Sequence, residues 1–195
     1  KKNSWKNCLM IEKNNEKNNS KGGVIPEWAE KVVIRPAANI DLKELEWEGE
    51  FANFRKVYAE VFDRMQKGFS IMWVADLLSW GIIGQVFVQL VSKSAELADG
   101  HHRAYVHSYR VRPEYRHAGV GSRLMHTAEA DLQKRGYSEV CLNVAKNNPL
   151  ARRIYDHLGY QVISKNSGKW WYYDQYNELQ YVNEPSWRML KKINT

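Results

Sequence analysis

The stretch from residue 111 to residue 121 joins an alternating apolar run to a helical pattern and ends in two glycines. Glycine lets the backbone approach a ligand closely, and the first N–H groups of a helix lack partners and carry partial positive charge. Arg116, His117 and Arg123 lie around this turn, and the first acidic residue after the glycines is Glu129. The pattern predicts an anion site at the helix start. A flexible strand-to-helix connection is the alternative.

The spacing Val-x-Pro-x-x-Arg-x-x-Gly-x-Gly in this stretch resembles the acyl-CoA pyrophosphate motif of the GNAT N-acetyltransferase superfamily. Residues 116–121 match its Arg/Gln-x-x-Gly-x-Gly/Ala segment. His117 stands at a variable position where the commonest form of the motif has glycine. The resemblance implies that the bound anion is the pyrophosphate of coenzyme A.

A second motif follows at the spacing that the resemblance requires. Residues 148–160 read Asn-x-x-Ala-x-x-x-Tyr-x-x-x-Gly-Tyr, which is similar to the GNAT segment Asn-x-x-Ala-x-x-x-Tyr-x-x-x-Gly-Phe/Tyr. The resemblance covers about residues 32–193. It implies an α/β fold with a central mixed, mostly antiparallel sheet and helices on both faces, and it implies acetyl-CoA as the co-substrate.

The resemblance also assigns roles to individual residues. Tyr155 matches the position that donates a proton to the sulfur of coenzyme A, and a phenol with a pKa near ~10 is protonated at neutral pH. A core tyrosine on a helix face is the alternative. The residues expected to contact the coenzyme, the first three through their backbone, are Tyr109, Arg110, Val111, Arg116, His117, Ala118, Gly119, Val120, Gly121, Ser122, Asn143, Asn148, Ala151 and Tyr155.

Two residues are candidates for the general base. His107 has an ordinary pKa of ~6.5, which suits proton removal from an ammonium group directly or through water. Glu48 is the second candidate. A structural or surface histidine is the alternative for His107. The resemblance implies direct attack by the amine within a ternary complex, without a covalent acetyl-enzyme.

Two segments are candidates for the acceptor site. Residues 46–50 place three carboxylates beside Trp47. The resemblance implies that this segment borders the acceptor pocket, where such a set can hold an amine cation; a solvated helix face is the alternative. Residues 164–184 carry many Trp and Tyr side chains within what reads as a long connection, and long connections are often functional. The alternative for this second segment is a cover over a sheet edge or a subunit contact.

The elements that position these residues follow from the periodicity of apolar residues. Helices are expected over 41–67 with a break at Gly49, from the glycine motif to 135, and over 149–158 with Asn148 as the N-terminal cap. An antiparallel start followed by alternating strands and helices predicts a mixed sheet with helices on both faces. If the side chains of a strand over 103–111 alternate strictly between the two faces, those that share one face are Tyr105, His107, Tyr109 and Val111. The expected strands are 32–34, 70–77, 81–92, 103–111, 139–145 and 186–193.

Length and charge indicate one domain with an appended segment. Residues 1–27 read as a polar tail or linker rich in Lys and Asn, and residues 28–195 as the domain. The net charge of +7 is concentrated at the start, since residues 1–23 hold six Lys and two Glu while the remainder holds 23 basic and 20 acidic residues. This near balance argues against nucleic acid as the partner.

Membrane, disulfide and metal sites are not expected. No apolar run reaches the ~20 residues that span a bilayer, and the first residues lack the apolar centre of a signal peptide, so we expect a cytoplasmic protein. Cys8 and Cys141 lie far apart and form no Cys-x-x-Cys pattern, which argues against a disulfide and a zinc site. Cys141 reads as a small core residue.

Taken together, the sequence favours an acetyl-CoA-dependent N-acetyltransferase. Its acceptor is a primary amine on a small molecule, a peptide or a protein, and a homodimer is a possible assembly. The alternative is a non-catalytic acyl-CoA-binding regulatory module.

Overall fold

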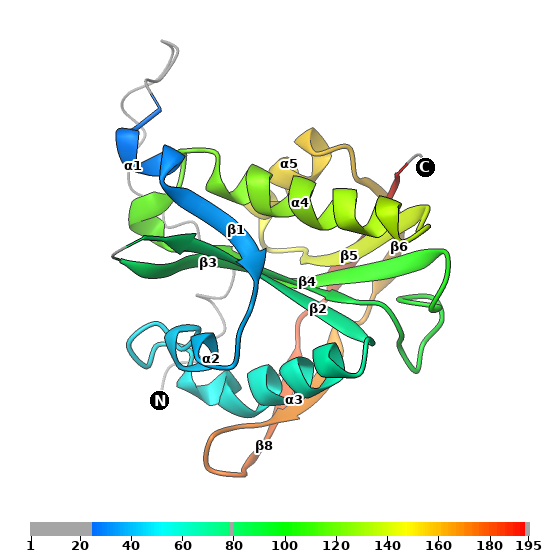
Figure 1. Ribbon diagram of the computed structural model, residues 1–195. Helices are drawn as coiled ribbons and strands as arrows, with labels where there is room; N and C mark the ends of the chain where they lie inside the picture. The colour runs from blue at the N-terminus through cyan, green and yellow to red at the C-terminus, as the bar shows by residue number, and fades with distance from the viewer. Residues whose placement is uncertain (1–24, 79, 194–195) are drawn as a thin grey trace.

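A seven-stranded sheet with the strand order β1-β2-β3-β4-β5-β9-β6 organises the fold (Figure 1). The computed structural model describes residues 25–78 and 80–193. Strands β4 and β5 are parallel, and every other neighbouring pair in this sheet is antiparallel. The predicted mixed, mostly antiparallel α/β architecture is therefore confirmed. The strands are β1 (Val32–Pro36), β2 (Ser70–Leu77), β3 (Gly81–Gln89), β4 (Arg103–Val111), β5 (Glu139–Ala145), β6 (Gln161–Asn166), β7 (Lys169–Tyr173), β8 (Leu179–Asn183) and β9 (Ser186–Lys192).

Helices cover both faces of the sheet, as predicted (Figure 1). Helices α4 and α5 lie on one face, which we call the α4 face, and α2 and α3 lie on the other, the α3 face. Each face has its own core: Leu124 and Met125 belong to the first, and Phe54 and Tyr58 to the second. The helices are α1 (Glu27–Glu30), α2 (Asp41–Glu44), α3 (Arg55–Gln66), α4 (Val120–Lys134) and α5 (Pro149–His157), with 3-10 turns η2 (Ala52–Phe54) and η3 (Pro113–Tyr115).

A β-bulge interrupts β4 at Ser108. His107 pairs with Phe87 of β3, whereas Arg110 pairs with Gln85, so two residues of β4 lie opposite one residue of β3. Ser108 has a positive φ of 51°. An extra residue in one strand bends that strand and changes the direction of the side chains that follow.

The bulge reverses the faces to which the β4 side chains point. His107 lies on the α3 face, and beyond the bulge Arg110 takes that face and donates a hydrogen bond to the Tyr58 hydroxyl. Tyr109 and Val111 pack instead into the core of the α4 face. Strict alternation predicted one shared face for Tyr105, His107, Tyr109 and Val111. That prediction is wrong, because it assumed a strand without an extra residue.

The parallel pair β4 and β5 separates beyond Val106. Pairing runs only from Arg103 opposite Glu139 to Val106 opposite Leu142, although both strands continue further. The last residues of β4 therefore have no pairing partner on the side of β5. We call this feature the β4–β5 divergence.

The predicted helix over 41–67 is interrupted for longer than expected. Helix α2 ends at Glu44, and a turn over residues 45–51 precedes η2 and α3. Gly49 has a positive φ of 98°, as a break requires, but Trp47 and Glu48 also have positive φ values of 45° and 54°. Two non-glycine residues in the left-handed region are unusual and costly.

The aromatic segment over 164–184 is mostly a β-hairpin rather than an irregular connection. Strands β7 and β8 pair antiparallel as a separate two-stranded sheet. Tyr172 and Val182 enter the core of the α3 face, while Trp171 and Tyr181 are exposed. Of the predicted tail, residues 25–27 are described and Glu27 begins α1; the rest lies outside the described residues, so the domain boundary stays a prediction.

Gly84 of β3 lies where the sheet approaches α4 most closely. A Cβ atom there would lie 3.2 Å from the Arg110 carbonyl oxygen and 3.2 Å from Leu124 Cδ1. We expect Gly84→Ala to lower the free energy of unfolding by about 1–3 kcal/mol, the usual cost of overpacking, as measured by urea denaturation. A gain in stability, as expected for Gly→Ala at a strand position with space for a side chain, contradicts this prediction.

Candidate active site

The start of α4 presents unpaired backbone donors. Gly119 precedes the helix in the left-handed conformation, with φ 79°, and no side chain caps the helix or places a negative charge in its first turn. Within residues 25–78 and 80–193, no backbone carbonyl accepts from the N–H groups of residues 120–122. These groups and the helix dipole together suit an anion.

Only two of the three side chains predicted to support this anion site remain near it. Arg116 donates from Nε to the Val111 carbonyl at 2.9 Å, which folds the turn onto the end of β4. His117 is exposed and has a positive φ of 64°. Arg123 instead donates to the carbonyls of Ala29 and Val32, at 2.8 and 2.6 Å. Arg123 therefore holds α4 to the start of β1 and does not point to an anion.

The end of β4 turns some of its backbone groups toward the divergence. Arg112 donates its N–H to the Ile83 carbonyl of β3, and the Arg110 carbonyl lies close to Gly84 of β3. Because strand backbone groups alternate in direction, Tyr109 and Val111 face the side that β5 has left. The backbone of Arg110, which the sequence analysis included in the coenzyme site, faces β3 instead.

The turn and the strand meet at Gly121. A Cβ atom at Gly121 would collide with the Tyr109 hydroxyl, so only glycine allows this close approach. The structure thus brings the glycine motif, the end of β4 and the first turn of α4 together, as predicted.

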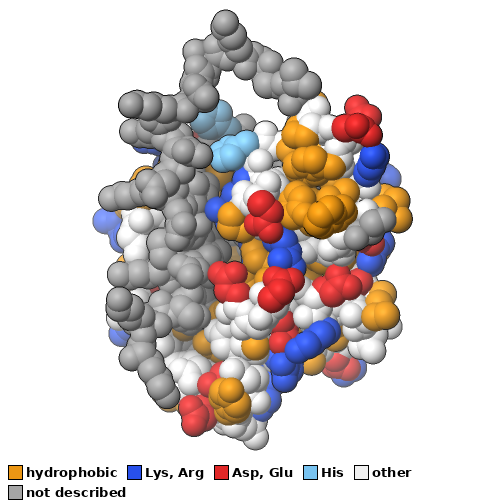
Figure 2. Space-filling view, turned by 90° about the vertical axis from the view of Figure 1, so that its left-hand side faces the viewer, with side chains coloured by type: hydrophobic (Ala, Val, Ile, Leu, Met, Phe, Trp, Pro, Cys, Tyr) orange, Lys and Arg blue, Asp and Glu red, His pale blue; other side chains and the backbone are white. Residues whose placement is uncertain are grey.

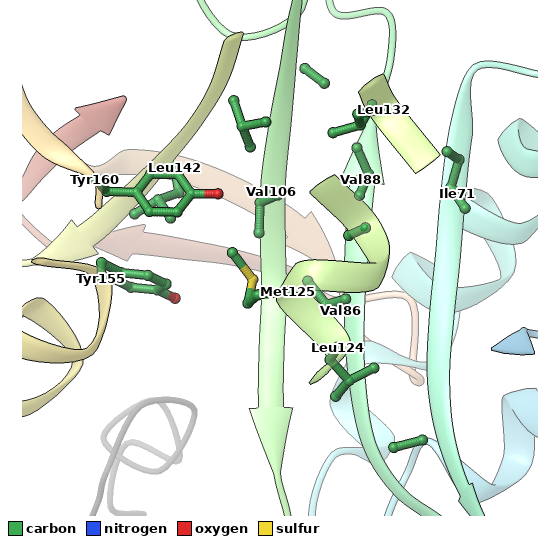
Figure 3. Close-up of a cluster of buried hydrophobic side chains, with 14 of the residues drawn as sticks. Ile71, Val86, Val88, Val106, Leu124, Met125, Leu132, Leu142, Tyr155 and Tyr160 are labelled. Atoms are coloured by element: carbon green, nitrogen blue, oxygen red, sulfur yellow. The ribbon is translucent and has the colours of Figure 1, made fainter. Parts of the chain in front are cut away.

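Tyr155 of α5 lies beside the same end of β4. Its ring centroid is 6.1 Å from that of Tyr109 and 6.0 Å from that of Tyr160. Figure 3 shows the Tyr155 and Tyr160 rings one above the other, with both hydroxyl groups directed toward the strand that carries Val106. Burial raises the pKa of Tyr155 well above its ordinary value, so its phenol is protonated at neutral pH.

Two further predicted coenzyme residues, Asn148 and Asn143, form hydrogen bonds within the protein. Asn148 accepts from the Ala151 N–H at 2.9 Å and so caps α5 as predicted. Asn143 donates to the Tyr105 hydroxyl at 3.3 Å and accepts from Arg188 at 3.4 Å. The Asn143 side chain is thus engaged within the protein, and its predicted contact with the coenzyme receives no support from this geometry.

Both candidate bases are weaker bases than their residue types suggest. Burial, and to a smaller degree Arg64, lowers the pKa of His107 to about 4, so its imidazole is neutral at pH 7. Its Nδ1 lies 3.1 Å from Ser108 Oγ, and its Nε2 is buried without a partner in the described chain. Glu48 accepts two hydrogen bonds from Arg112, at 2.7 and 2.9 Å, which lower its pKa. Glu48 is also mostly exposed, so His107 is the better placed of the two.

The segment 46–50 is a turn rather than a helix face, and its first two residues are buried while residues 48–50 are exposed. Glu46 and Trp47 are 2% and 5% exposed. Glu46 accepts two hydrogen bonds from Arg55, at 2.7 and 2.8 Å, which lower its pKa. Its carboxylate is therefore already neutralised by a cation of the protein.

Sequence reasoning missed two buried polar side chains on the α3 face. Arg110 was assigned a backbone role only, and Gln85 was assigned none, yet they lie opposite each other on β4 and β3 and are 7% and 0% exposed. The available signal was a charged side chain between apolar residues near the end of 103–111 and an amide side chain in the apolar run 81–88. Because strict alternation assumes no bulge, it did not predict that the side chains of Arg110 and His107 point to the same face of the sheet.

Charged side chains of both signs lie on the visible surface. In the part of Figure 2 that grey atoms do not cover, acidic and basic side chains are interspersed. No described helix is long and apolar enough to cross a membrane. Over the described part of the chain, no three His, Cys, Asp or Glu side chains are grouped so that they could hold a metal ion.

Comparisons with known proteins agree with this arrangement. The model of the Acetyltransferase (GNAT) family matches residues 39–160. Arabidopsis thaliana NAA60 in complex with acetyl-CoA is 19% identical over 84% of this chain and 99% of that chain, with a TM-score of 0.60. The spermidine/spermine N-acetyltransferase SpeG from Vibrio cholerae, in complex with manganese ions, is 16% identical over 85% and 94%, with a TM-score of 0.61. The ribosomal-protein-S18-alanine N-acetyltransferase from Escherichia coli is 17% identical over 84% and 95%, with a TM-score of 0.60. At such identities, these structures show a shared fold.

The depressed pKa of His107 makes a prediction about stability. Between pH 6.5 and 4 the unfolded chain binds more protons at this site than the folded chain, so the free energy of unfolding falls as the pH falls through this range. We expect the stability difference between wild type and His107→Gln to shrink by about 2–3 kcal/mol from pH 7 to pH 4. Urea denaturation at several pH values measures it. His126→Gln, at an exposed histidine of α4, is the control, and an equal pH dependence in both variants contradicts the prediction.

Proposed function

We propose that this chain, which belongs to the acetyltransferase (GNAT) family, transfers an acetyl group from acetyl-CoA to a primary amine by direct attack within a ternary complex. The observation that carries the proposal is the β4–β5 divergence beside the uncapped start of α4, with Tyr155 next to it. The shared fold with an acetyl-CoA complex supports the choice of co-substrate.

The residues at the start of α4 fit the coenzyme. The N–H groups of residues 120–122 and the positive end of a 15-residue helix suit a diphosphate. The backbone groups of Tyr109 and the N–H of Val111 suit the amide groups of pantetheine and the carbonyl of the thioester, whereas the Val111 carbonyl already accepts from Arg116. Backbone donors fixed in this way stabilise the negative charge that develops on a carbonyl oxygen.

Acetyl-CoA supplies an activated thioester. The protein holds the thioester and the amine in place and provides the groups that donate and accept hydrogen bonds. A C–N bond to the amine forms while the C–S bond breaks. The phenol of Tyr155 lies ready as a donor to the departing sulfur. Because its pKa is far above the ~8.5 of a typical thiol, a strong hydrogen bond to the sulfur suits Tyr155 better than complete proton transfer.

The proton that the amine loses goes to His107 or to water. His107 is neutral at pH 7 and has a free ring nitrogen, so it can accept a hydrogen bond from an amine. Known proteins of this fold include enzymes named for spermidine/spermine and for the alanine of a ribosomal protein. These names favour an amine acceptor without selecting one for this chain.

An amine screen tests the proposal. The full chain is incubated with acetyl-CoA and a panel of amino acids, polyamines and peptides, and free thiol release is measured. Turnover with at least one amine supports the proposal. Coenzyme A binding without turnover favours the non-catalytic binding module instead, and the absence of both binding and turnover contradicts both functions.

Tyr155→Phe tests the role of the phenol. We expect kcat to fall by about 10²–10³-fold, as when one hydrogen-bond donor to a developing negative charge is removed, with little change in the affinity for coenzyme A measured by calorimetry. Tyr137→Phe is the control, because it removes a buried tyrosine hydroxyl beyond the far end of α4. An equal and small effect of both variants would exclude an acid role for Tyr155.

A further inference from the structure

The guanidinium of Arg110 is buried on the α3 face without an anionic partner. Nη2 donates to the Tyr58 hydroxyl at 2.8 Å, whereas Nε and Nη1 have no partner among the described residues. Arg188, the other buried arginine of the described chain, pairs with Glu96 at 2.8 Å. Among the described residues, no carboxylate forms an ion pair with Arg110. A buried charge without a counter-charge is strongly unfavourable.

Aromatic rings compensate part of this cost. The guanidinium carbon lies 3.9 Å from the centroid of the Phe51 ring and 5.6 Å from that of Trp47. Phe54 and Tyr58 complete the surroundings at 6.0 and 5.8 Å. Ring faces attract the positive charge, but they do not replace an acceptor for the N–H groups in the guanidinium plane. The N–H groups of Nε and Nη1 of Arg110 therefore remain available to a hydrogen-bond acceptor on a ligand.

Unsatisfied polar atoms are concentrated around Arg110. Gln85, directly opposite on β3, is fully buried and neither atom of its amide has a partner. His107 Nε2 and Trp47 Nε1 are also buried without partners. Six of the eight such side-chain atoms in the described chain belong to these four residues. Because buried polar groups are normally hydrogen-bonded, this concentration indicates a polar ligand.

The chemistry of these atoms specifies the ligand. Arg110 and the indole of Trp47 offer donors and a positive charge, which suit a carboxylate. The Gln85 carbonyl and the free nitrogen of His107 offer acceptors, which suit the N–H groups of an amine. A polyamine would bring further positive charge to a site that already holds an unpaired cation, so it is disfavoured.

We propose that Arg110 binds the carboxylate of the acceptor and that the acceptor is a small amino acid whose amine is acetylated. This inference rests on the proposed acetyltransferase function. It places the acceptor on the α3 face of the end of β4, while the backbone of Tyr109 and Val111 on the same strand faces the coenzyme site. The bulge at Ser108 lies between His107 and Arg110, so both groups that would contact the acceptor flank it.

Matched acceptors test the proposal on the wild-type protein. Each amino acid in the thiol-release assay is compared with its own amide, which keeps the amine and removes the carboxylate. We expect kcat/KM to be about 100-fold higher for the amino acid, as for the loss of a charge-assisted hydrogen bond to a buried cation. Equal or better turnover of the amide overturns this inference and leaves the proposed function intact.

Arg110→Met identifies the residue responsible. Methionine has a similar length and suits an aromatic environment, so we expect the preference for the amino acid over its amide to disappear through loss of amino acid turnover. Arg112→Met is the matched control: Arg112 also contacts the Trp47 ring, at 5.1 Å, but is paired with Glu48, so its variant should keep the preference. A loss of both activities in equal measure in Arg110→Met would assign Arg110 a structural role and overturn the inference.

An equilibrium measurement separates this inference from catalysis. Calorimetry of an N-acetyl amino acid binding to the protein with coenzyme A reports the carboxylate contact without turnover. We expect binding to wild type and to Arg112→Met, and affinity about 100-fold weaker for Arg110→Met. If no amine is acetylated but this binding depends on Arg110, the proposed function fails and the carboxylate site stands. Equal binding to all three proteins contradicts the carboxylate site.

Discussion

The extra residue at Ser108 determines to which face of the sheet each side chain at the end of β4 points. Without the bulge, the side chains of residues 107 and 110 would point to opposite faces of the sheet. With it, His107 and Arg110 share the α3 face, and Tyr109 packs on the α4 face next to Tyr155. The backbone of the same few residues lies where β4 leaves β5. In the proposed function, a coenzyme on one side and an acceptor on the other would therefore meet across this single strand.

On the α3 face, the carboxylates Glu46, Glu48 and Asp41 are paired within the protein, whereas Arg110 has no carboxylate partner among the described residues. Glu46 and Asp41 are buried, and each is held by an arginine of its own, Arg55 and Arg35. Glu48 is satisfied in the same way by Arg112. Two of the three carboxylates that the sequence predicted as anchors for an amine, Glu46 and Glu48, are thus paired within the protein. The buried Arg110 has no carboxylate partner among the described residues, so the charge available to the proposed acceptor site is opposite in sign to the predicted one.

Sequence patterns predicted the elements well and their side-chain directions less well. The glycine motif, the cap at Asn148 and the order of strands depend on local chemistry, namely free N–H groups at a helix start and the period of apolar residues. The bulge at Ser108 and the turn around Trp47 depend on tertiary contacts, since serine and tryptophan do not favour positive φ. The candidate acceptor contacts follow from these two irregularities, so local patterns could not reveal them.

The hairpin of β7 and β8 can change in length during evolution without altering the seven-stranded sheet. Strands β6 and β9 pair with each other directly, and the hairpin is inserted between them outside the seven-stranded sheet. The entropy of closing a longer insertion grows slowly, by about 0.6 kcal/mol for each doubling of its length. Tyr172 nevertheless places the hairpin against Asn53 and the core near Arg110. Insertions and deletions in this hairpin can thus reshape the surroundings of the proposed acceptor site while the register of the sheet stays unchanged.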